Sequence, residues 1–362
     1  MDAQQIGRLT ARWIAELPGE GSTVISGLGV QPLLAMLAEV ADEPAHTELV
    51  EAAGERYGGL LEAPGLRMAL GLWTRPEVEL QAGVDRFLPP EVRGTLTDQA
   101  ALDAWVAEQT DGLLQRMPVQ LTPDVLLVLA SALALKTEWA LPFTEYPRGE
   151  RRWLSRSDDD LDSLRVHDSA AGPLTVVTVR GAGEFDVRLV IGDGERATVL
   201  PAALSLEDDG TPGAEVLAAE RPAPGVQVIE SMAPAVILSL PYFEIDAEHD
   251  LLRHPAVFGL TAAADHSRGH FPGLSPQPLA LDQARQVVMA RFSATGFEAA
   301  AATAMPMAAG SAPTFDAKAL YVHLERPFGF VAVHRPTGVP VVAGWVGRPD
   351  PQAITVPAAA GR

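Results

Sequence analysis

The sequence predicts an α+β fold, and three observations carry this prediction. Apolar residues recur three or four positions apart from Ile6 to Leu17, which is the pattern of an amphipathic helix. Residues 125–135 are apolar on both alternating sets of positions, as in a strand that is buried on both faces. Two further apolar segments, 286–292 and 319–333, also have the composition of buried strands.

Size and charge limit the class of protein. A chain of 362 residues with 47% hydrophobic residues can hold one large core, or two to three ordinary domains. The formal net charge is −20, from 27 Lys and Arg against 47 Asp and Glu. Nucleic acids and anionic membranes require a positive surface, so we expect neither as a partner. The absence of cysteine excludes disulfides, thiolate catalysis and cysteine-bound metals.

The N-terminal third reads as helices with one short strand. The first helix should end before Pro18, because proline cannot continue a helix. Residues 22–26 suit a short strand, and Pro32 suits the first turn of the helix that follows. Residues 102–112 read as a helix that ends at Gly112, since glycine readily adopts the left-handed conformation.

The middle of the chain carries fewer signals. Apolar residues alternate with polar ones over 185–191, which predicts a half-exposed strand, and the turn 192–194 follows it. The acidic run 158–162 lacks calcium-loop spacing and reads as a solvated loop. His266 and His270 are four residues apart, but the neighbouring glycine and proline favour a loop, so we expect no metal site.

The segment 296–311 is the most unusual connection, because it is long, small-residued and nearly uncharged. Alanine is the best helix former, so an alanine-rich helix is one reading. The other reading is a segment that lies outside the sheet but can become one of its strands if a gap opens. Gly296 would then be the hinge. Pro306 forbids a helix interior near the far end of the segment.

This segment and several others resemble the serpin family of protease inhibitors, in a member of prokaryotic, bacterial type. Gly296 is followed by a Phe-Glu-Ala-Ala-Ala-Ala-Thr-Ala run and later by Arg-Pro-Phe-Gly-Phe at 326–330, which resembles the serpin reactive-centre loop and the strand after it. Residues 102–112, 136–143 and 240–274 resemble further serpin blocks in the same order. The C-terminal strand 339–347 resembles the last strand of the family.

The resemblance implies a fold more specific than the α+β class. It implies one large mixed sheet, smaller sheets, about eight to nine helices and an exposed reactive-centre loop. It also implies a single domain over residues 1–349, because serpin-like blocks lie on both sides of every turn-rich segment. Residues 350–362 are expected to form a flexible tail.

The function implied by the resemblance is suicide-substrate inhibition of serine proteases, and of cysteine proteases as well. A protease cuts the loop and forms an acyl-enzyme, which is trapped when the cut loop inserts into the central sheet. The expected hinge of this loop consists of Gly296, Phe297, Glu298, Ala299, Ala300, Ala301, Ala302, Thr303 and Ala304.

The scissile bond is predicted only within a bracket. Family spacing counted from Gly296 points to Gly310–Ser311, whereas counting back from Arg326 gives a later position. The candidates are therefore Met307, Ala308, Ala309, Gly310 and Ser311. Small or thioether side chains at this position suit an elastase-like or subtilisin-like target protease.

The resemblance also implies two groups of residues in the central sheet beneath the loop, known in serpins as the breach, where the loop enters the sheet, and the shutter. They are Lys136, Trp139, Ser26, Gly29, Ser131 and Gln286. Gly29, Ser131 and Gln286 stand where the family has Ser, Asn and His. Because the three hydrogen-bonding residues are replaced together, we expect a re-packed shutter. Phe297 replaces a small residue, and close packing should resist its ring. These departures support an alternative, a non-inhibitory serpin-fold protein with a binding or other acquired role.

The remaining expectations concern chemistry and context. No nucleophile elbow, phosphate loop or zinc motif is found in the sequence, so no catalytic residues and no cofactor are expected, and an enzyme is the least favoured reading. The N-terminus lacks the pattern of a signal peptide. A cytoplasmic monomer is expected from the sequence as it stands, or a secreted one if a signal peptide has been removed.

Overall fold

The computed structural model describes residues 2–54, 61–149, 151–207, 209–297 and 316–347. Within these ranges the chain forms three β-sheets and seven α-helices, one or two fewer helices than expected. The helices are α1 (Ala3–Glu16), α2 (Gln31–Ala38), α3 (Ala45–Ala53), α4 (Gln99–Gln109), α5 (Arg196–Leu204), α6 (Gly213–Ala219) and α7 (Pro255–Phe258). Four 3₁₀ turns are η1 (Val84–Arg86), η2 (Pro90–Val92), η3 (Leu161–Ser163) and η4 (Leu251–Arg253).

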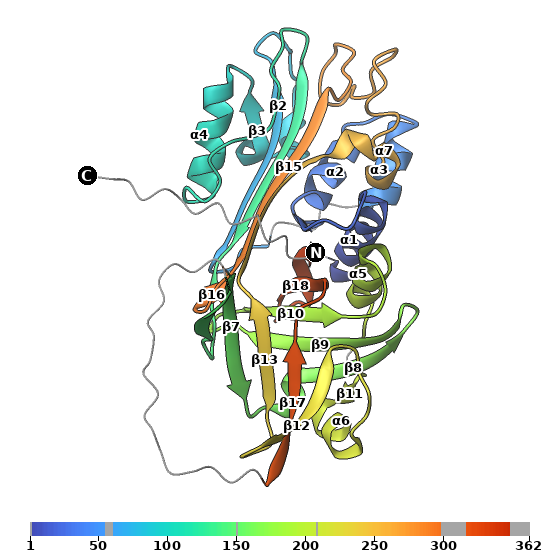
Figure 1. Ribbon diagram of the computed structural model, residues 1–362. Coiled ribbons are helices and arrows are strands. Elements are labelled where there is room, and N and C mark those ends of the chain that lie inside the picture. Colours follow the sequence, from blue (N-terminus) through green and yellow to red (C-terminus); the bar gives the residue numbers. More distant parts are fainter. Residues whose placement is uncertain (1, 55–60, 150, 208, 298–315, 348–362) are drawn as a thin grey trace, which may run out of the picture.

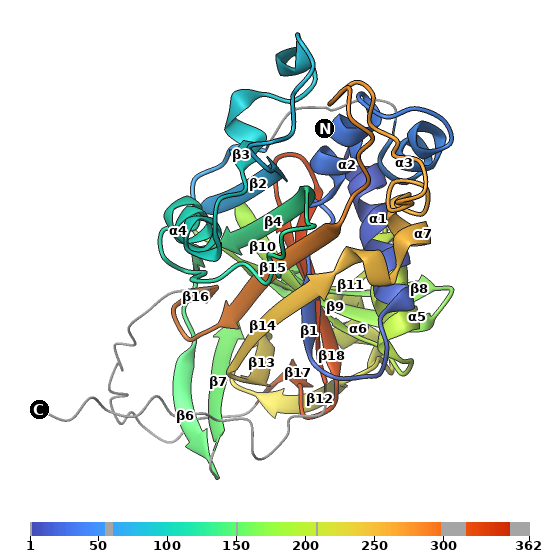
Figure 2. The same cartoon turned by 90° about the horizontal axis from the view of Figure 1, so that it is seen from above.

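One sheet, which we call the long sheet, is built around two central strands that run parallel to each other. Its strands are β3 (Arg93–Thr95), β2 (Leu66–Thr74), β4 (Leu127–Leu135), β15 (Gln283–Phe292), β16 (Gly296–Phe297) and β5 (Thr137–Glu138), with β14 (Phe243–Asp250) paired to β15. In the view from above, β2, β4, β15 and β14 lie side by side (Figure 2). The pairs β2–β4 and β14–β15 are antiparallel, whereas β4–β15 is parallel.

The second sheet lies in the lower half of the molecule in Figure 1, together with the third sheet. In order, its strands are β1 (Thr23–Ile25), β19 (Val339–Val346), β18 (Phe328–His334), β10 (Phe185–Ile191), β9 (Gly172–Arg180), β8 (Leu164–Ser169) and β11 (Thr211–Pro212). The third sheet carries the strand that follows residues 298–315, which lie outside the described part of the chain. In order, its strands are β12 (Val226–Ser231), β17 (Ala317–His323), β13 (Val236–Pro241), β7 (Arg151–Asp158) and β6 (Thr144–Arg148).

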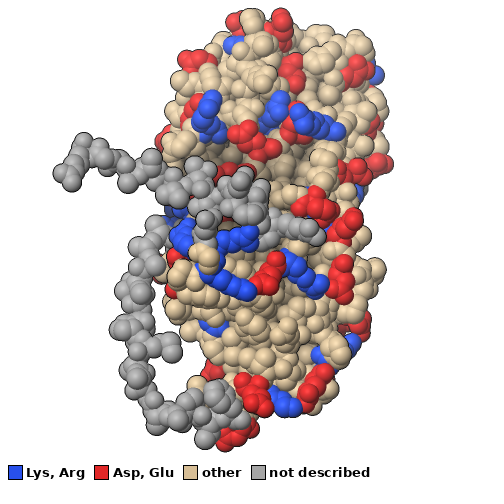
Figure 3. All heavy atoms as spheres, viewed as in Figure 1, with Lys and Arg blue, Asp and Glu red and all other residues tan. Residues whose placement is uncertain are grey.

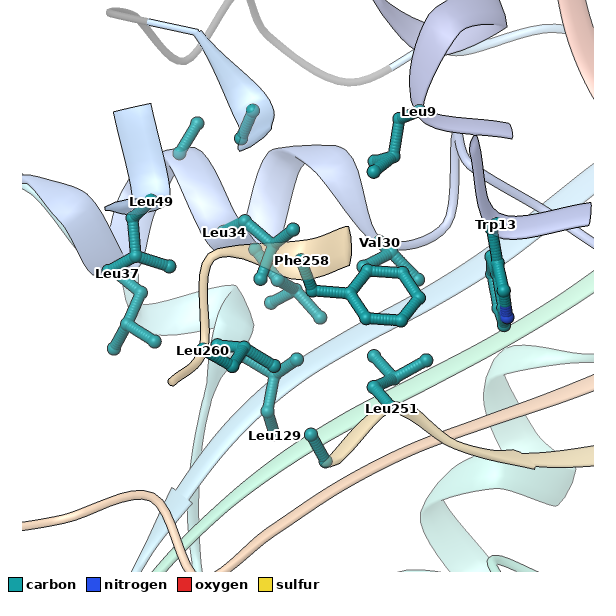
Figure 4. Packing of buried hydrophobic residues seen from close by; sticks show 14 of the residues in the cluster. Leu9, Trp13, Val30, Leu34, Leu37, Leu49, Leu129, Leu251, Phe258 and Leu260 are labelled. Carbon is teal, nitrogen blue, oxygen red and sulfur yellow. The ribbon is translucent and has the colours of Figure 1, made fainter. Parts of the chain in front are cut away.

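The long sheet packs helices on both of its faces (Figure 1). On one face the core contains α1, α2, α3 and α7, and Phe258 packs there against Trp13 with ring centroids 4.9 Å apart (Figure 4). On the other face α4 covers Val128 and Val287, which belong to a separate apolar cluster. The strand β4 is consequently buried along its whole length, as its unbroken apolar sequence predicts.

Most local predictions hold at their expected places. Helix α1 is capped at its N-terminus by Asp2, whose carboxylate accepts the backbone N–H of Gln4 at 3.0 Å, and it ends at Glu16, before the expected proline. Proline occupies the first turn of α2. Helix α4 ends with two left-handed residues, Asp111 at φ 52° and Gly112 at φ 78°.

The prediction of a half-exposed strand over 185–191 was wrong. In β10 only Arg188 is exposed, and the residues of both faces are otherwise buried. The strand lies in the centre of the second sheet, and α5 packs near its second face. Asp186 is tolerated on that face because Arg335 pairs with its carboxylate at 2.6 Å.

On the face seen in Figure 3, acidic and basic side chains are interspersed, with no broad field of one sign. Among the described helices, none is long and apolar enough to cross a lipid bilayer.

Candidate functional site at the open end of the long sheet

The parallel strands β4 and β15 pair only along part of their length. Their ladder runs over six residue pairs, from Val128 and Gln283 to Leu133 and Val288. Beyond Val288, strand β15 continues to Phe292, but its residues there have no partner on β4 within the described pairing. The two strands therefore separate at one end, which we call the open end of the long sheet.

Strand β16 occupies this open end. Gly296 pairs with Glu138 and Phe297 with Thr137 on β5, while Phe297 also pairs with Phe292 on β15. Both pairings are antiparallel. Since β5 follows β4 after one residue, β16 lies between the continuations of β4 and β15 and runs antiparallel to both.

A tight turn sets the direction of β16. The backbone N–H and the hydroxyl of Ser293 both donate to the carbonyl of Gly296 at 2.9 Å, which reverses the chain directly after β15. Sequence reasoning did not single out this turn. The small polar cluster Ser293 to Gly296 is a turn signal that could have revealed it.

Trp139 closes the core beneath this turn, and only 3% of its surface is exposed. Its indole N–H donates to the carbonyl of Ser293, and its backbone N–H donates to the carbonyl of Thr295, each at 2.9 Å. Its ring lies 4.6 Å from that of Phe292. Lys136 is different, because its side chain is exposed and only its backbone N–H is fixed, to the carbonyl of Gly65 at 2.8 Å.

The core accommodates the Phe297 ring, which its size had led us to expect would be excluded by close packing. Its side chain is fully buried, and its ring centroid lies 6.1 Å from that of Phe330. It shares an apolar cluster with Phe292 and Phe328, so the core has room for a large side chain directly after the hinge glycine. Sequence alone could not show this, because the space is created by residues of two other strands, β15 and β18.

The four shutter candidates meet in one buried hydrogen-bonded group, which we call the Gln286 cluster: Ser26, Gly29, Ser131 and Gln286. The amide oxygen of Gln286 accepts the backbone N–H of Ser26 at 2.9 Å, and its amide nitrogen donates to the carbonyl of Ser26 at 2.9 Å. That nitrogen also reaches the hydroxyl of Ser131 on β4 at 3.4 Å. The hydroxyl of Ser131 donates to the carbonyl of Gly29 at 2.5 Å.

The absence of a side chain at Gly29 is required by this packing. A Cβ atom there would lie 2.8 Å from the Ser131 hydroxyl oxygen and 3.0 Å from the Gln286 amide nitrogen. The hydroxyl of Ser26 connects this cluster to β19. It accepts from the backbone N–H of Gly29 at 3.0 Å and donates to the carbonyl of Val341 at 2.6 Å. The three departures therefore form one satisfied group that joins β4, β15 and β19.

The other candidate residues lie outside the described part of the chain. These are the hinge residues Glu298, Ala299, Ala300, Ala301, Ala302, Thr303 and Ala304, and the scissile-bond candidates Met307, Ala308, Ala309, Gly310 and Ser311. Their roles stay predictions.

A second feature, missed by the sequence analysis, is a cavity of about 780 Å³ over the second sheet. Apolar side chains of β9, β10 and β18 line it, namely Val176, Val190, Val331 and Val333. Five arginines line it as well: Arg156, Arg165, Arg180, Arg188 and Arg335. Their positions on separate strands could not be brought together from the sequence.

The five arginines differ in their partners. Arg335 pairs with Asp186, which raises the pKa of the guanidinium, and burial lowers the pKa of Arg156, which pairs with Asp158 at 3.1 Å. In the part of the chain that the structure describes, neither Arg180 nor Arg188 has a carboxylate partner within 4.0 Å. The cavity thus combines an apolar lining with basic and acidic side chains, because six carboxylates line it as well: Asp158, Asp159, Asp160, Asp162, Asp186 and Glu207.

Comparisons with known proteins point to one family. The model for "Serpin (serine protease inhibitor)" matches residues 217–349. The chain is 24% identical to plasminogen activator inhibitor 1 of the pig, Sus scrofa, over 96% of this chain and 92% of that protein. The native structure of tengpin, a thermophilic serpin, superposes with a TM-score of 0.71 at 16% identity, over 96% of this chain and 94% of that one. A thyroxine-binding globulin complex with thyroxine superposes with a TM-score of 0.67 at 19% identity, over 95% and 97%.

Proposed function

We propose that this chain, which resembles serpins in sequence and in fold, inhibits serine proteases as a suicide substrate, by inserting the part of the 298–315 segment that precedes the cut between β4 and β15. The family includes protease inhibitors such as plasminogen activator inhibitor 1. One observation of this chain carries the proposal: β16 already lies at the open end of the long sheet and runs antiparallel to both strands that border it.

The register of β16 gives the position of each inserted residue. Continuing its pairing with β5 onto β4 places residues 299–305 opposite 129–135, and Pro306 opposite Val128. Val128 is the residue at which the existing β4–β15 ladder ends. The run 299–305, which is small-residued except for Met305, therefore matches the length of the strand that the sheet can accept, and the proline falls at the last residue pair of the ladder.

Insertion would also improve the pairing of the sheet. At present β4 and β15 form a parallel ladder, which is slightly less stable per residue than an antiparallel one. A strand that continues β16 would be antiparallel to both neighbours. Its odd-numbered residues would face the same core as Phe297, and its even-numbered residues would face the α4 side. Alanines on both faces can enter without displacing packed side chains.

The proposed reaction begins as ordinary proteolysis. The nucleophile of the protease attacks a carbonyl carbon within 307–311, the peptide bond breaks, and the amine of the next residue leaves. The acyl group stays bonded to the protease while the new strand forms, so the protease is carried along the sheet before water can release it. Small and thioether residues at 307–311 favour elastase-like and subtilisin-like targets over proteases that require a basic residue.

We expect a covalent complex with an elastase-like or subtilisin-like protease that survives denaturing electrophoresis. The same protein, cut in the loop, should melt at a higher temperature than the uncut protein, because it has gained a central strand. A trypsin-like protease is the matched control and should form little complex. Clean cleavage without any complex, and without a rise in melting temperature, would refute inhibition.

A second function, the binding of a small molecule without protease inhibition, is supported by the cavity over the second sheet. Its valine lining suits an apolar body, and Arg180 and Arg188 offer charge-assisted hydrogen bonds to an anionic group. One serpin-fold neighbour, thyroxine-binding globulin, is described in complex with thyroxine. We therefore propose small amphipathic anions as the ligand class for this second function.

The aromatic sulfonate 8-anilinonaphthalene-1-sulfonate is a suitable probe, because its fluorescence rises in apolar surroundings. We expect Arg188→Gln to weaken its binding about 10-fold, the loss of one charge-assisted hydrogen bond. Arg116→Gln, on an exposed arginine outside the cavity lining, is the matched control. Equal binding by both variants would exclude the cavity as the site.

A further inference from the structure

A cleft of about 460 Å³ lies where β14 ends. The C-terminal end of α1, the connection from α1 to β1, the end of η4 and the start of β15 form its walls. Among the described residues that line it, none also lines the cavity over the second sheet, and none belongs to the Gln286 cluster or to β16. Its volume falls within the range of small-molecule sites, about 300–1,000 Å³. The cleft is thus a separate candidate site for a small ligand.

Two aromatic rings, those of Trp13 and His249, form one side of the cleft. Their centroids are 5.1 Å apart and their planes meet at 76°. The Nε2 atom of His249 lies 2.8 Å from the carbonyl oxygen of Val24. Because a carbonyl only accepts hydrogen bonds, Nε2 carries the proton, and Nδ1 is left as an acceptor. Burial lowers the pKa of His249, so the ring stays neutral at neutral pH.

Both rings present an unused polar atom to the cleft. Within the described chain, the indole N–H of Trp13 and the Nδ1 atom of His249 have no hydrogen-bond partner, although neither atom is fully enclosed by protein. Only 1% of Trp13 is exposed, and Figure 4 shows its nitrogen on the side of the ring turned away from Phe258. A donor and an acceptor side by side suit a group that both accepts and donates, and a hydroxyl group does so.

The charged groups of the cleft leave one positive charge in excess. Arg285 and Arg253 share one carboxylate oxygen of Asp250, at 3.0 and 4.0 Å, and the other oxygen of Asp250 accepts a backbone N–H of η4. Arg196 is 2% exposed and donates to three backbone carbonyls, without a carboxylate within 4.0 Å in the described chain. Glu248 is the second carboxylate of the lining. Three arginines therefore face two carboxylates, in a protein whose net charge is −20.

We propose that this cleft binds small hydroxycarboxylates. The hydroxyl group of the ligand lies between the two rings, where it accepts from the indole N–H of Trp13 and donates to Nδ1 of His249. The carboxylate of the ligand receives charge-assisted hydrogen bonds from Arg253 and Arg285, which have only Asp250 to share. The inference uses neither the segment 298–315 nor the proposed inhibition of proteases.

L-malate and succinate are a matched pair of probes, because they differ by one hydroxyl group. Isothermal titration calorimetry on the full chain at pH 7 measures both dissociation constants. We expect L-malate to bind at least about 10-fold more tightly than succinate, since succinate leaves the indole N–H and the imidazole nitrogen without a partner.

Two variants test the two ends of the ligand separately. Arg253→Gln removes a guanidinium that is 81% exposed, and it should weaken the binding of L-malate about 10-fold, whereas Arg86→Gln, on an exposed arginine outside the cleft, should not change it. Trp13→Phe keeps an aromatic ring but loses the N–H. It should reduce the preference for L-malate over succinate to about 3-fold, a ratio that does not depend on a change in stability.

The results that overturn the inference are specific. Failure of L-malate to bind the parent protein more tightly than about 10 mM would refute the site. Equal affinity for L-malate and succinate would refute the role of the two rings. If both variants bind L-malate and succinate as the parent does, the ligand lies elsewhere and the cleft is excluded. A covalent complex with a protease, or its absence, bears on the proposed function alone.

Discussion

Under the proposed mechanism, Thr303→Arg should convert this protein from an inhibitor into a plain substrate. Continuing the register of β16 along β4 brings residue 303 opposite Ser131, and continuing it along β15 brings the same residue opposite Gln286. The existing ladder pairs Ser131 with Gln286, so the two registers agree. Residue 303 would face the same core as Phe297, where the Gln286 cluster offers amide and hydroxyl groups but no carboxylate.

An arginine at that position would be buried without a counter-charge, which costs about 3 kcal/mol or more and should lower the yield of covalent complex by about 100-fold. The cut variant should also show no rise in melting temperature. Met232→Arg places the same side chain on an exposed turn and is the control, with inhibition expected to match the parent. Full inhibition by Thr303→Arg would show that the loop does not insert in this register.

Gln286→Leu should destabilise the uncut protein more than any other single change in the Gln286 cluster. Leucine has a similar volume and leaves the Ser131 hydroxyl its bond to the Gly29 carbonyl, but it cannot bond the backbone N–H and carbonyl of Ser26, which are buried. Leaving such groups without partners costs about 1–3 kcal/mol each, so we expect a loss of about 2–5 kcal/mol in the free energy of unfolding. Urea unfolding followed by circular dichroism measures it.

The control for this change is Gln109→Leu, on an exposed glutamine at the end of α4, which should alter the free energy of unfolding by less than about 0.5 kcal/mol. If the two variants unfold at the same urea concentration, the cluster does not contribute to the stability of the uncut state. Both side chains lose an amide, so the comparison isolates burial and hydrogen bonding.

The candidate site was predictable in part. The hinge glycine and its alanines are contiguous, and a family resemblance in contiguous residues can be read directly. The joint replacement of three shutter residues was also visible and suggested re-packing. The partners could not be predicted, because the Gln286 amide fills space that Gly29 leaves empty, and these residues are more than 250 positions apart in the chain. The same limit produced the wrong expectation for Phe297, whose burial depends on Phe292 and Phe330.

The sequence by itself determined the fold class, the resemblance to serpins and the composition of a segment able to become a strand. Those properties depend on local pattern: the period of apolar residues, the places of proline and glycine, and the run of alanines after Gly296. Tertiary structure alone decided that β4 and β15 separate at one end, that β16 occupies the opening, and that β12 covers the outer edge of β17. These are pairings between strands distant in the chain, and their register is fixed by buried side chains that meet only after folding.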